Sequence, residues 1–164
     1  MNDRPLPPPL RATELIYEIP ALLGLVFLAV WPAIHWSSLP ETVPTHFGFD
    51  GEPDGWGDKR SIWILPGIAL ALYLMLTAAM RFPHRFNYLW PITPENAARQ
   101  YAFARRLISL LKIEIVWTFA FLTWRMTEIA RGDAARLGAA FLPVVLIALL
   151  ATVTWYLIKA QSDA

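Results

Sequence analysis

The segment from residue 39 to residue 61 gathers side chains that could bind a metal ion. It holds five acids, four glycines and three prolines, and its Lys and Arg residues stand only at its end. Asp50, Glu52 and Asp54 have the spacing of the first three calcium ligands of an EF-hand loop, and Asp58 stands at its ninth position. Ser61 stands where such a loop needs its bidentate Glu, so calcium is only a minor alternative. The stronger expectation is that Asp50 and Asp54 close Asx turns and that Lys59 pairs with a loop carboxylate.

Histidine chemistry is the second possibility in this segment. Zinc takes three or four ligands at about 2.0–2.3 Å, and His46 with His35, eleven residues earlier, does not supply that set. The chain has no His-Glu-x-x-His motif, no Ser-His-Asp order that suggests a catalytic triad, and no cysteine. We therefore expect neither a metal nor a cofactor. His46 is expected to form a hydrogen bond within the segment or to contact a partner.

Two charged residues, Lys112 and Glu114, interrupt an otherwise apolar stretch. They are two positions apart, so on a helix they point to nearly opposite sides and do not pair with each other. Glu18 is the expected partner of Lys112. If Arg106 marks the headgroups, Glu114 lies about 12 Å deeper, close to the centre of a bilayer. Glu114 is either a proton-carrying or ligand-binding acid, or a protonated group in an interhelical hydrogen bond. We favour the hydrogen bond, because no chain of further acids or histidines lines the other apolar stretches.

The composition places these residues in a membrane protein. Of the 164 residues, 56% are apolar and 16% charged, and the mean hydropathy is +0.41, whereas soluble domains carry about 25% charged residues. Three runs contain no Asp, Glu, Lys or Arg: 19–36, 61–80 and 137–158. About 20 apolar residues suffice for a helix to cross the hydrocarbon core. The composition excludes a disordered chain, a soluble enzyme and a nucleic-acid binder, and the net charge of +1 attracts no partner by itself.

We expect an all-α membrane protein with four transmembrane helices and an ordered extracytoplasmic loop between the first two. Residues 1–164 form one membrane domain with these parts: cytoplasmic tail 1–16, first span 17–36, outside loop 37–60, second span 61–80, inside loop and juxtamembrane helix 81–106, third span 107–126, outside loop 127–136, fourth span 137–158 and cytoplasmic tail 159–164. Thr93-Pro94-Glu95 signals a helix start, so the polar stretch 96–106 and the third span are predicted to form one long helix. The first span is interpreted as an uncleaved anchor, since it exceeds the roughly 7–15 apolar residues of a signal peptide.

Orientation follows from the positions of Lys and Arg. Eight of them fall in the two tails and the middle loop, and five fall in the loops on the other side. This bias predicts that both termini lie inside and that the segment 37–60 faces outside.

The outside segment also resembles a known family. Its sequence contains Leu39-Pro40, then Val43-Pro44-Thr45-His46-Phe47, then Gly51-Glu52-Pro53-Asp54-Gly55-Trp56-Gly57-Asp58-Lys59. This order resembles the signature of the domain of unknown function 1648, found in SdpI-like bacterial membrane proteins. The best-known member confers immunity to a secreted peptide toxin and takes part in signalling its presence. The SdpI-like immunity proteins carry further transmembrane helices, so the resemblance implies a short stand-alone member in a bacterial cytoplasmic membrane more than it implies immunity.

We expect a non-enzymatic integral membrane protein whose outside loop recognises another membrane protein or a secreted peptide, with an immunity or signalling role as in SdpI-like proteins. Six loop residues are expected to form the recognition site: Pro44, His46, Gly51, Pro53, Asp54 and Lys59. Two alternatives remain open. One is an accessory subunit of a larger membrane complex, and the other is proton or solute transport centred on Glu114. The expected partners are the lipid bilayer and this membrane protein or secreted peptide. No nucleic acid is expected to bind.

Overall fold

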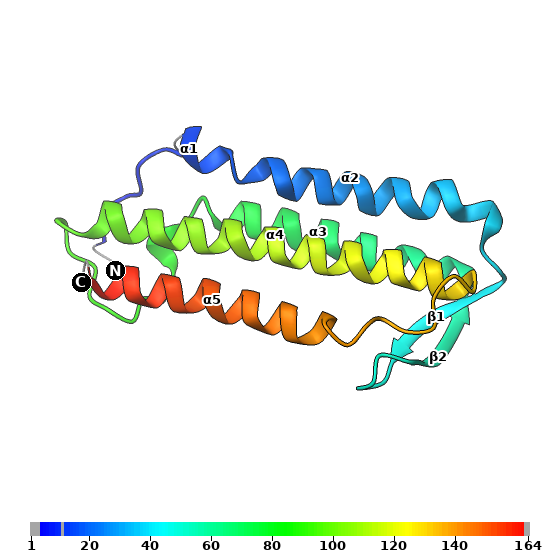
Figure 1. Ribbon diagram of the computed structural model, residues 1–164. Helices are drawn as coiled ribbons and strands as arrows, with labels where there is room; N and C mark the ends of the chain where they lie inside the picture. Colours follow the sequence, from blue (N-terminus) through cyan, green and yellow to red (C-terminus); the bar gives the residue numbers. More distant parts are fainter. Residues whose placement is uncertain (1–3, 11, 163–164) are drawn as a thin grey trace.

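The computed structural model describes residues 4–10 and 12–162. Four long helices run side by side along the molecule (Figure 1): α2 (Glu18–His35), α3 (Ile64–Ala79), α4 (Ala97–Ala130) and α5 (Phe141–Ser162). Short helical segments accompany them: α1 (Ala12–Leu15), η1 (Trp36–Ser38), η2 (Lys59–Trp63) and η3 (Pro83–Arg85). Within the described residues, four helical stretches are long and apolar enough to cross a membrane, with η1 extending α2 and η2 extending α3. The predicted four apolar helices are confirmed, and they indicate a multi-pass membrane protein.

Helix α4 occupies the centre of the bundle and packs against α2, α3 and α5. A small residue allows α2 to approach α4 closely, since a Cβ added to Gly24 would lie 2.5 Å from Cγ1 of Val116. Val116 and Ala120 form a buried cluster with Leu28 of α2 and Ala69 of α3. The core of the bundle is therefore built around one face of α4.

Helix α5 is the most exposed of the four. Only Thr152 and Ala160 of this helix are buried, and its packing is mainly against α4. In a bilayer, the remaining faces of α5 must be covered by lipid or by another protein chain, because soluble proteins rarely leave so much apolar surface open.

Helix α4 is a single helix of 34 residues, so the predicted long helix is confirmed. It follows a compact turn in which Asn96 Oδ1 accepts a hydrogen bond from the Thr93 amide at 2.9 Å, while Asn96 Nδ2 donates to the Pro91 carbonyl at 3.1 Å. These bonds satisfy polar groups just before the first helical turn, where backbone amides have no partner within the helix.

Helix α5 does not coincide with the predicted fourth span at either end. Helix α5 begins at Phe141, four residues later than residue 137, and extends to Ser162, beyond the predicted end at residue 158. The late start has a physical cause. The Leu137 amide donates to the Gly51 carbonyl at 2.9 Å, and Gly138 has a φ of 103°, which is incompatible with a right-handed helix. Apolarity alone marked residues 137–140 as membrane-spanning, although they belong to the loop.

The loop between α2 and α3, which is predicted to face outside, contains a β-hairpin, so the all-α expectation is wrong for this segment. Strand β1 (Thr42–Phe47) pairs antiparallel with β2 (Pro53–Asp58), in a register that joins Thr42 to Asp58 and Phe47 to Pro53. The register shifts around His46, as in a β-bulge. The tip closes through Gly51, whose φ of 76° is disfavoured for a side chain with a Cβ. The expectation of an ordered loop is confirmed.

The hairpin rests on one end of the bundle, called the outer end here because the positions of Lys and Arg predict that it faces outside. The opposite end is called the inner end. Leu39, Val43, Ile62 and Met126 form a second buried cluster, which joins the hairpin to η2 and α4. The first and last described residues lie together at the opposite end of the molecule (Figure 1). Arg11, one of the eight cations assigned to the inner side, lies outside the described residues.

Candidate functional site

The hairpin brings two of the predicted recognition residues into direct contact. His46 on β1 and Asp54 on β2 are joined by a 2.5 Å hydrogen bond between Nδ1 and Oδ1, and both side chains are more than half exposed. The antiparallel pairing brings the two residues close together, because His46 lies opposite Gly55, the residue that follows Asp54 on β2. The prediction that His46 forms a hydrogen bond within the loop is confirmed. Among the residues that the structure describes, no backbone amide donates to Asp54, so the expected Asx turn at Asp54 is wrong.

The other four predicted residues support the hairpin. Pro44 is buried and Pro53 begins β2, while Gly51 occupies the tip. Lys59 places Nζ 4.7 Å from the centre of the Trp36 ring, and the structure shows no ion pair for it among the described residues. The predicted pairing of Lys59 with a loop carboxylate is therefore wrong, since a cation–π contact takes its place.

The four acids of the calcium alternative are not brought together. Oδ1 of Asp50 accepts from the Glu52 amide at 3.0 Å, which confirms the Asx turn at Asp50, and Oδ1 of Asp58 accepts from the Arg60 amide at 2.8 Å. Glu52 forms an ion pair with Arg136 at 3.1 Å, and Asp54 is engaged by the histidine. Across residues 4–10 and 12–162 no three His, Asp or Glu side chains are grouped as a metal ion requires.

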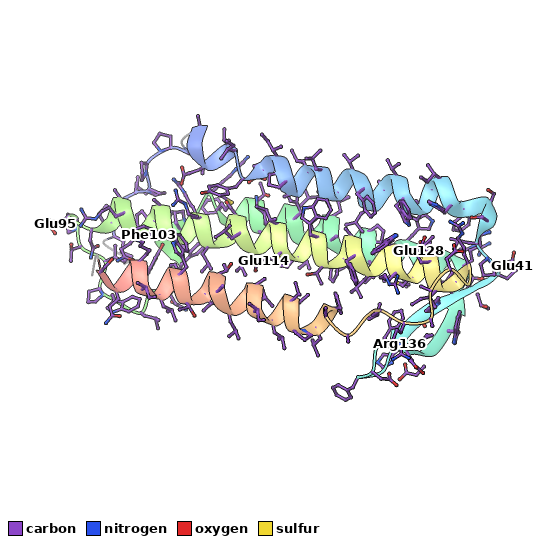
Figure 2. All side chains as sticks on the ribbon, in the orientation of Figure 1. Glu41, Glu95, Phe103, Glu114, Glu128 and Arg136 are labelled. Carbon is purple, nitrogen blue, oxygen red and sulfur yellow. The ribbon has the colours of Figure 1, made fainter. Side chains whose placement is uncertain are left out.

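Two aromatic residues of the hairpin are exposed, and sequence reasoning did not select them. Phe49 at the tip is fully exposed, and Trp56 on β2 is about half exposed, at 52%. Aromatic side chains in a polar, glycine-rich loop are the sequence signal that could have found them, because such residues are enriched at interaction surfaces. The hairpin projects beyond the outer end of α5 in Figure 2, with Arg136 beside it.

The hairpin tip is fixed to the loop between α4 and α5. The Gly51 carbonyl accepts from the Leu137 amide at 2.9 Å, and the side chains of Arg136 and Glu52 pair at 3.1 Å. Arg125 of α4 donates in turn to the carbonyl of Arg136. The tip therefore holds a defined position although it lies far from the buried base of the hairpin.

A second group of polar residues lies inside the bundle and joins three helices. Nζ of Lys112 on α4 lies 2.5 Å from Oε1 of Glu18 on α2, and it donates to Oγ1 of Thr77 on α3 at 3.0 Å. The hydroxyl of Tyr73 donates to the other oxygen of Glu18 at 2.7 Å. The predicted pairing of Lys112 with Glu18 is confirmed. Both carboxylate oxygens of Glu18 and the ammonium group of Lys112 therefore have partners, and a buried ion pair is tolerated only under this condition.

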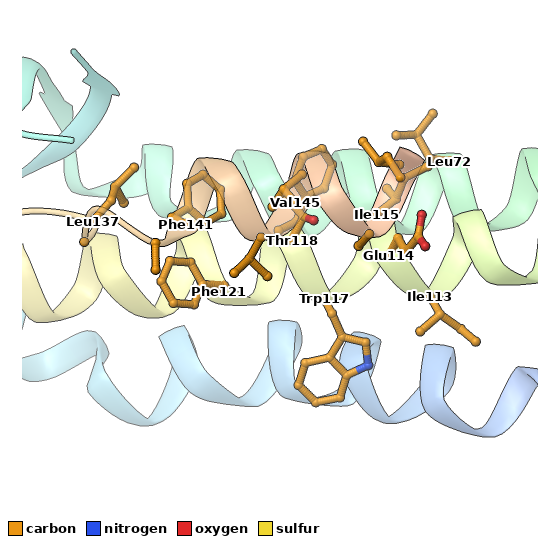
Figure 3. Close-up of a pocket in the computed structure, with 16 residues that line it drawn as sticks. Leu72, Ile113, Glu114, Ile115, Trp117, Thr118, Phe121, Leu137, Phe141 and Val145 are labelled. Carbon is orange, nitrogen blue, oxygen red and sulfur yellow. The ribbon is translucent and has the colours of Figure 1, made fainter. Parts of the chain in front are cut away.

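Glu114 lies on another face of α4 and is only partly satisfied. Thr152 of α5 donates to its Oε1 at 2.5 Å, so the predicted interhelical hydrogen bond is confirmed. Its Oε2 is buried and has no hydrogen-bond partner among the described residues. A cavity of about 670 Å³ adjoins this carboxyl group, between the outer halves of α4 and α5 and beside Leu72 of α3. Figure 3 shows Glu114 toward one end of the lining residues and Phe141 toward the other.

The amino-terminal tail is docked on the inner end of the bundle. Arg4 donates to the carbonyl of Phe86 at 2.6 Å and lies over the ring of Tyr88 at 5.5 Å. The hydroxyl of Tyr101 donates to the Pro5 carbonyl at 3.0 Å. Burial beneath this tail raises the pKa of Tyr88 above its ordinary value. The sequence predicted a tail here, and the structure adds that it covers the start of α4.

Comparison with known proteins places the hairpin within a known family pattern. Residues 23–70 match the family model described as "Domain of unknown function (DUF1648)". The predicted resemblance is confirmed for this segment. The matched stretch runs from α2 through the hairpin into α3, so it frames the outside loop with the two helices that position it.

An uncharacterized protein of Archaeoglobus fulgidus is 46% identical to this chain over 59 residues. That alignment covers 34% of this chain and 32% of the relative, so the chain spans about a third of the relative that it matches. No solved structure matches the chain.

Proposed function

We propose that this chain is a non-enzymatic membrane protein whose outside hairpin recognises a partner. The observation that carries the proposal is Phe49, a fully exposed aromatic side chain at the tip of a hairpin whose position is fixed. Exposing a large aromatic ring to water is unfavourable, and aromatic anchors dominate the energy of protein interfaces. A partner that covers Phe49 would therefore gain binding energy from a single side chain.

The hairpin is suited to this role because it is ordered before it binds. The buried base at Val43 and the contacts of Gly51 and Glu52 with the loop between α4 and α5 hold both of its ends. Ordering a flexible loop on binding costs about 0.5–1.5 kcal/mol per immobilised side chain, and a preformed hairpin avoids part of that cost. Beside the aromatic residues, the His46–Asp54 pair offers polar atoms that can select a partner.

The size of the surface favours a small partner. Its exposed aromatic and polar side chains come from two six-residue strands and the turn between them. A secreted peptide, or one loop of another membrane protein, would cover such a surface. The DUF1648 match over 23–70 includes the whole hairpin, and the immunity or signalling role of SdpI-like proteins is the form of recognition that we propose here.

Affinity purification from native membranes tests the proposal. Tagged protein should recover a partner or secreted peptide, and Phe49→Ala should weaken that binding by roughly thirtyfold, the equivalent of a hot-spot loss of ~2 kcal/mol. Phe82→Ala is the matched control, because it removes an exposed aromatic ring at the other end of the bundle. Equal recovery by both variants would contradict recognition through the hairpin. A stoichiometric set of large subunits that persists with Phe49→Ala would favour the accessory-subunit alternative.

A second candidate function is proton or solute transport centred on Glu114. The cavity of about 670 Å³ and the unpartnered Oε2 of Glu114 favour it, because a buried carboxyl oxygen beside a cavity can accept a ligand. Within the described residues Glu114 is the one ionisable residue that lines this cavity. Transport would therefore depend on a single carboxyl group.

A further inference from the structure

Arg106 of α4 is held in an unusual environment at the inner end of the bundle. Its guanidinium lies 5.6 Å from the ring centre of Tyr17 and 5.8 Å from that of Trp155. These rings come from the residue before α2 and from α5, so Arg106 stands between two helices on either side of α4. A hollow of about 360 Å³ opens beside it, lined also by Leu110, Ala151 and Thr152.

The guanidinium of Arg106 has no acidic partner among the described residues. Acids do lie close by, but other cations engage them. Glu14 pairs with Arg105 at 3.8 Å, and Glu18 pairs with Lys112 at 2.5 Å. Arginine stays charged at every accessible pH and presents five donors. The faces of the two aromatic rings attract the cation. They do not accept the hydrogen bonds that the N–H groups can donate in the plane of the guanidinium.

The depth of Arg106 determines which anion can reach it. Tyr17 immediately precedes α2, so the guanidinium beside it lies where the apolar part of α2 begins. Tyr and Trp gather at this level of a membrane, next to the headgroups. Leu110 and Ala151 line the same hollow toward the middle of the bilayer. The hollow is therefore polar at the headgroup level and apolar below it, as a phospholipid is.

We propose that this hollow binds one acidic phospholipid of the leaflet on the side of the termini. The phosphodiester lies on Arg106 between the rings of Tyr17 and Trp155, and an acyl chain runs along Leu110 and Ala151. The planar guanidinium can donate two parallel hydrogen bonds to phosphate oxygens, which a lysine cannot do. The lipid also bridges α2 and α5, two helices that α4 otherwise keeps apart.

Lipid-dependent thermal stability tests the site. Protein purified in detergent is titrated with phosphatidylglycerol, with phosphatidylcholine or with inorganic phosphate, and the unfolding midpoint is followed by tryptophan fluorescence. Phosphatidylglycerol should raise the midpoint more than phosphatidylcholine, and inorganic phosphate should not. Arg106→Gln should weaken the apparent affinity for phosphatidylglycerol about fivefold, which corresponds to ~1 kcal/mol for one cation at a membrane surface.

Two further variants separate lipid binding from a structural role. Arg81→Gln removes one exposed cation that follows Met80, whose carbonyl accepts from Arg105 next to Arg106, and this variant should keep the full preference for phosphatidylglycerol. Ala151→Phe leaves Arg106 in place but fills the hollow, so it should lose the preference as well. If Arg106→Gln does not accumulate, Arg106→Lys and Ala151→Phe provide the same test. The proposal would be overturned if phosphatidylglycerol and phosphatidylcholine raised the midpoint of the unaltered protein equally, or if inorganic phosphate raised it as much as phosphatidylglycerol. It would also be overturned if Arg106→Gln and Ala151→Phe kept the full preference for phosphatidylglycerol.

Discussion

Two ionisable groups, two residues apart on α4, have opposite local environments. Lys112 is almost completely buried and contacts an acid, a hydroxyl and an aromatic ring, whereas Glu114 receives one hydrogen bond and leaves one oxygen unpartnered. Their spacing of two residues causes the difference, because it turns one side chain toward α2 and α3 and the other toward α5. The first environment suits a structural ion pair, and the second leaves capacity to bind a proton or a ligand.

Replacement of Lys112 by Met should destabilise the bundle strongly. Removing one partner of a buried ion pair typically costs about 3–5 kcal/mol, because the remaining charge is left without compensation. The unfolding midpoint in detergent should fall accordingly. The double variant Lys112→Met with Glu18→Gln should recover part of the loss, since it removes both charges. The single variant Glu18→Gln completes the comparison. If the double variant lost as much stability as the two single variants together, the two residues would not be coupled.

The substitution Glu114→Gln distinguishes the two interpretations of this acid. Glutamine keeps the shape and the oxygen that accepts from Thr152, so the unfolding midpoint should change by less than the equivalent of ~1.5 kcal/mol. In liposomes with an internal pH dye, the unaltered protein and the variant should show the same proton flux if the hydrogen bond is the whole role of Glu114. A proton flux that Glu114→Gln abolishes would support transport instead. Thr152→Val serves as the structural control, because it removes the hydroxyl and keeps the carboxyl group.

At the scale of elements, the tip of the hairpin depends on the backbone conformation of one glycine. Gly51 adopts a φ of 76°, and a Cβ there would lie 3.5 Å from Cβ of Leu137. Gly51→Ala should therefore destabilise the hairpin by about 1–2 kcal/mol through backbone strain. Hydrogen exchange should increase at the amides of residues 42–58, while the helices keep their protection.

The matched control for this prediction is Gly67→Ala. Gly67 lies within α3, and an added Cβ would have no neighbour within 4 Å. Alanine is favoured over glycine inside a helix by about 1 kcal/mol, so this variant should be neutral or more stable. A hairpin that exchanges equally in both variants would show that the conformation of Gly51 does not hold the tip.

The helices were predictable from sequence and the hairpin was not, for a physical reason. A span is encoded by a local property, the apolarity of about 20 consecutive residues. The hairpin depends on interactions between distant segments, such as the buried cluster that includes Val43 and Met126 and the hydrogen bond between Leu137 and Gly51. Its prolines and glycines also hide the alternating pattern that usually marks strands. The same limit applied to Lys59, whose ring partner Trp36 becomes a neighbour only after the chain folds back.

At the scale of the whole molecule, the two ends of the bundle differ in chemistry. The outer end carries the hairpin with its exposed aromatic tip, and the inner end carries the docked tail and the hollow beside Arg106. The buried Lys112–Glu18 pair and the Glu114–Thr152 bond lie between them and tie α4 to its neighbours. In this arrangement, recognition would occur at one membrane surface and lipid binding at the other, on a shared helical frame.

The orientation of this frame is predicted to place the hairpin outside and both termini inside. Because the chain has no cysteine, single cysteines can report the side of each surface without background labelling. Glu41→Cys lies on the hairpin side, and Ser162→Cys ends α5 at the opposite end (Figures 1 and 2). A membrane-impermeant maleimide added to intact cells should label residue 41 and not residue 162 until the membrane is permeabilised. The reverse pattern would invert the orientation. Labelling of both sites in intact cells would contradict a bundle that crosses the membrane between them.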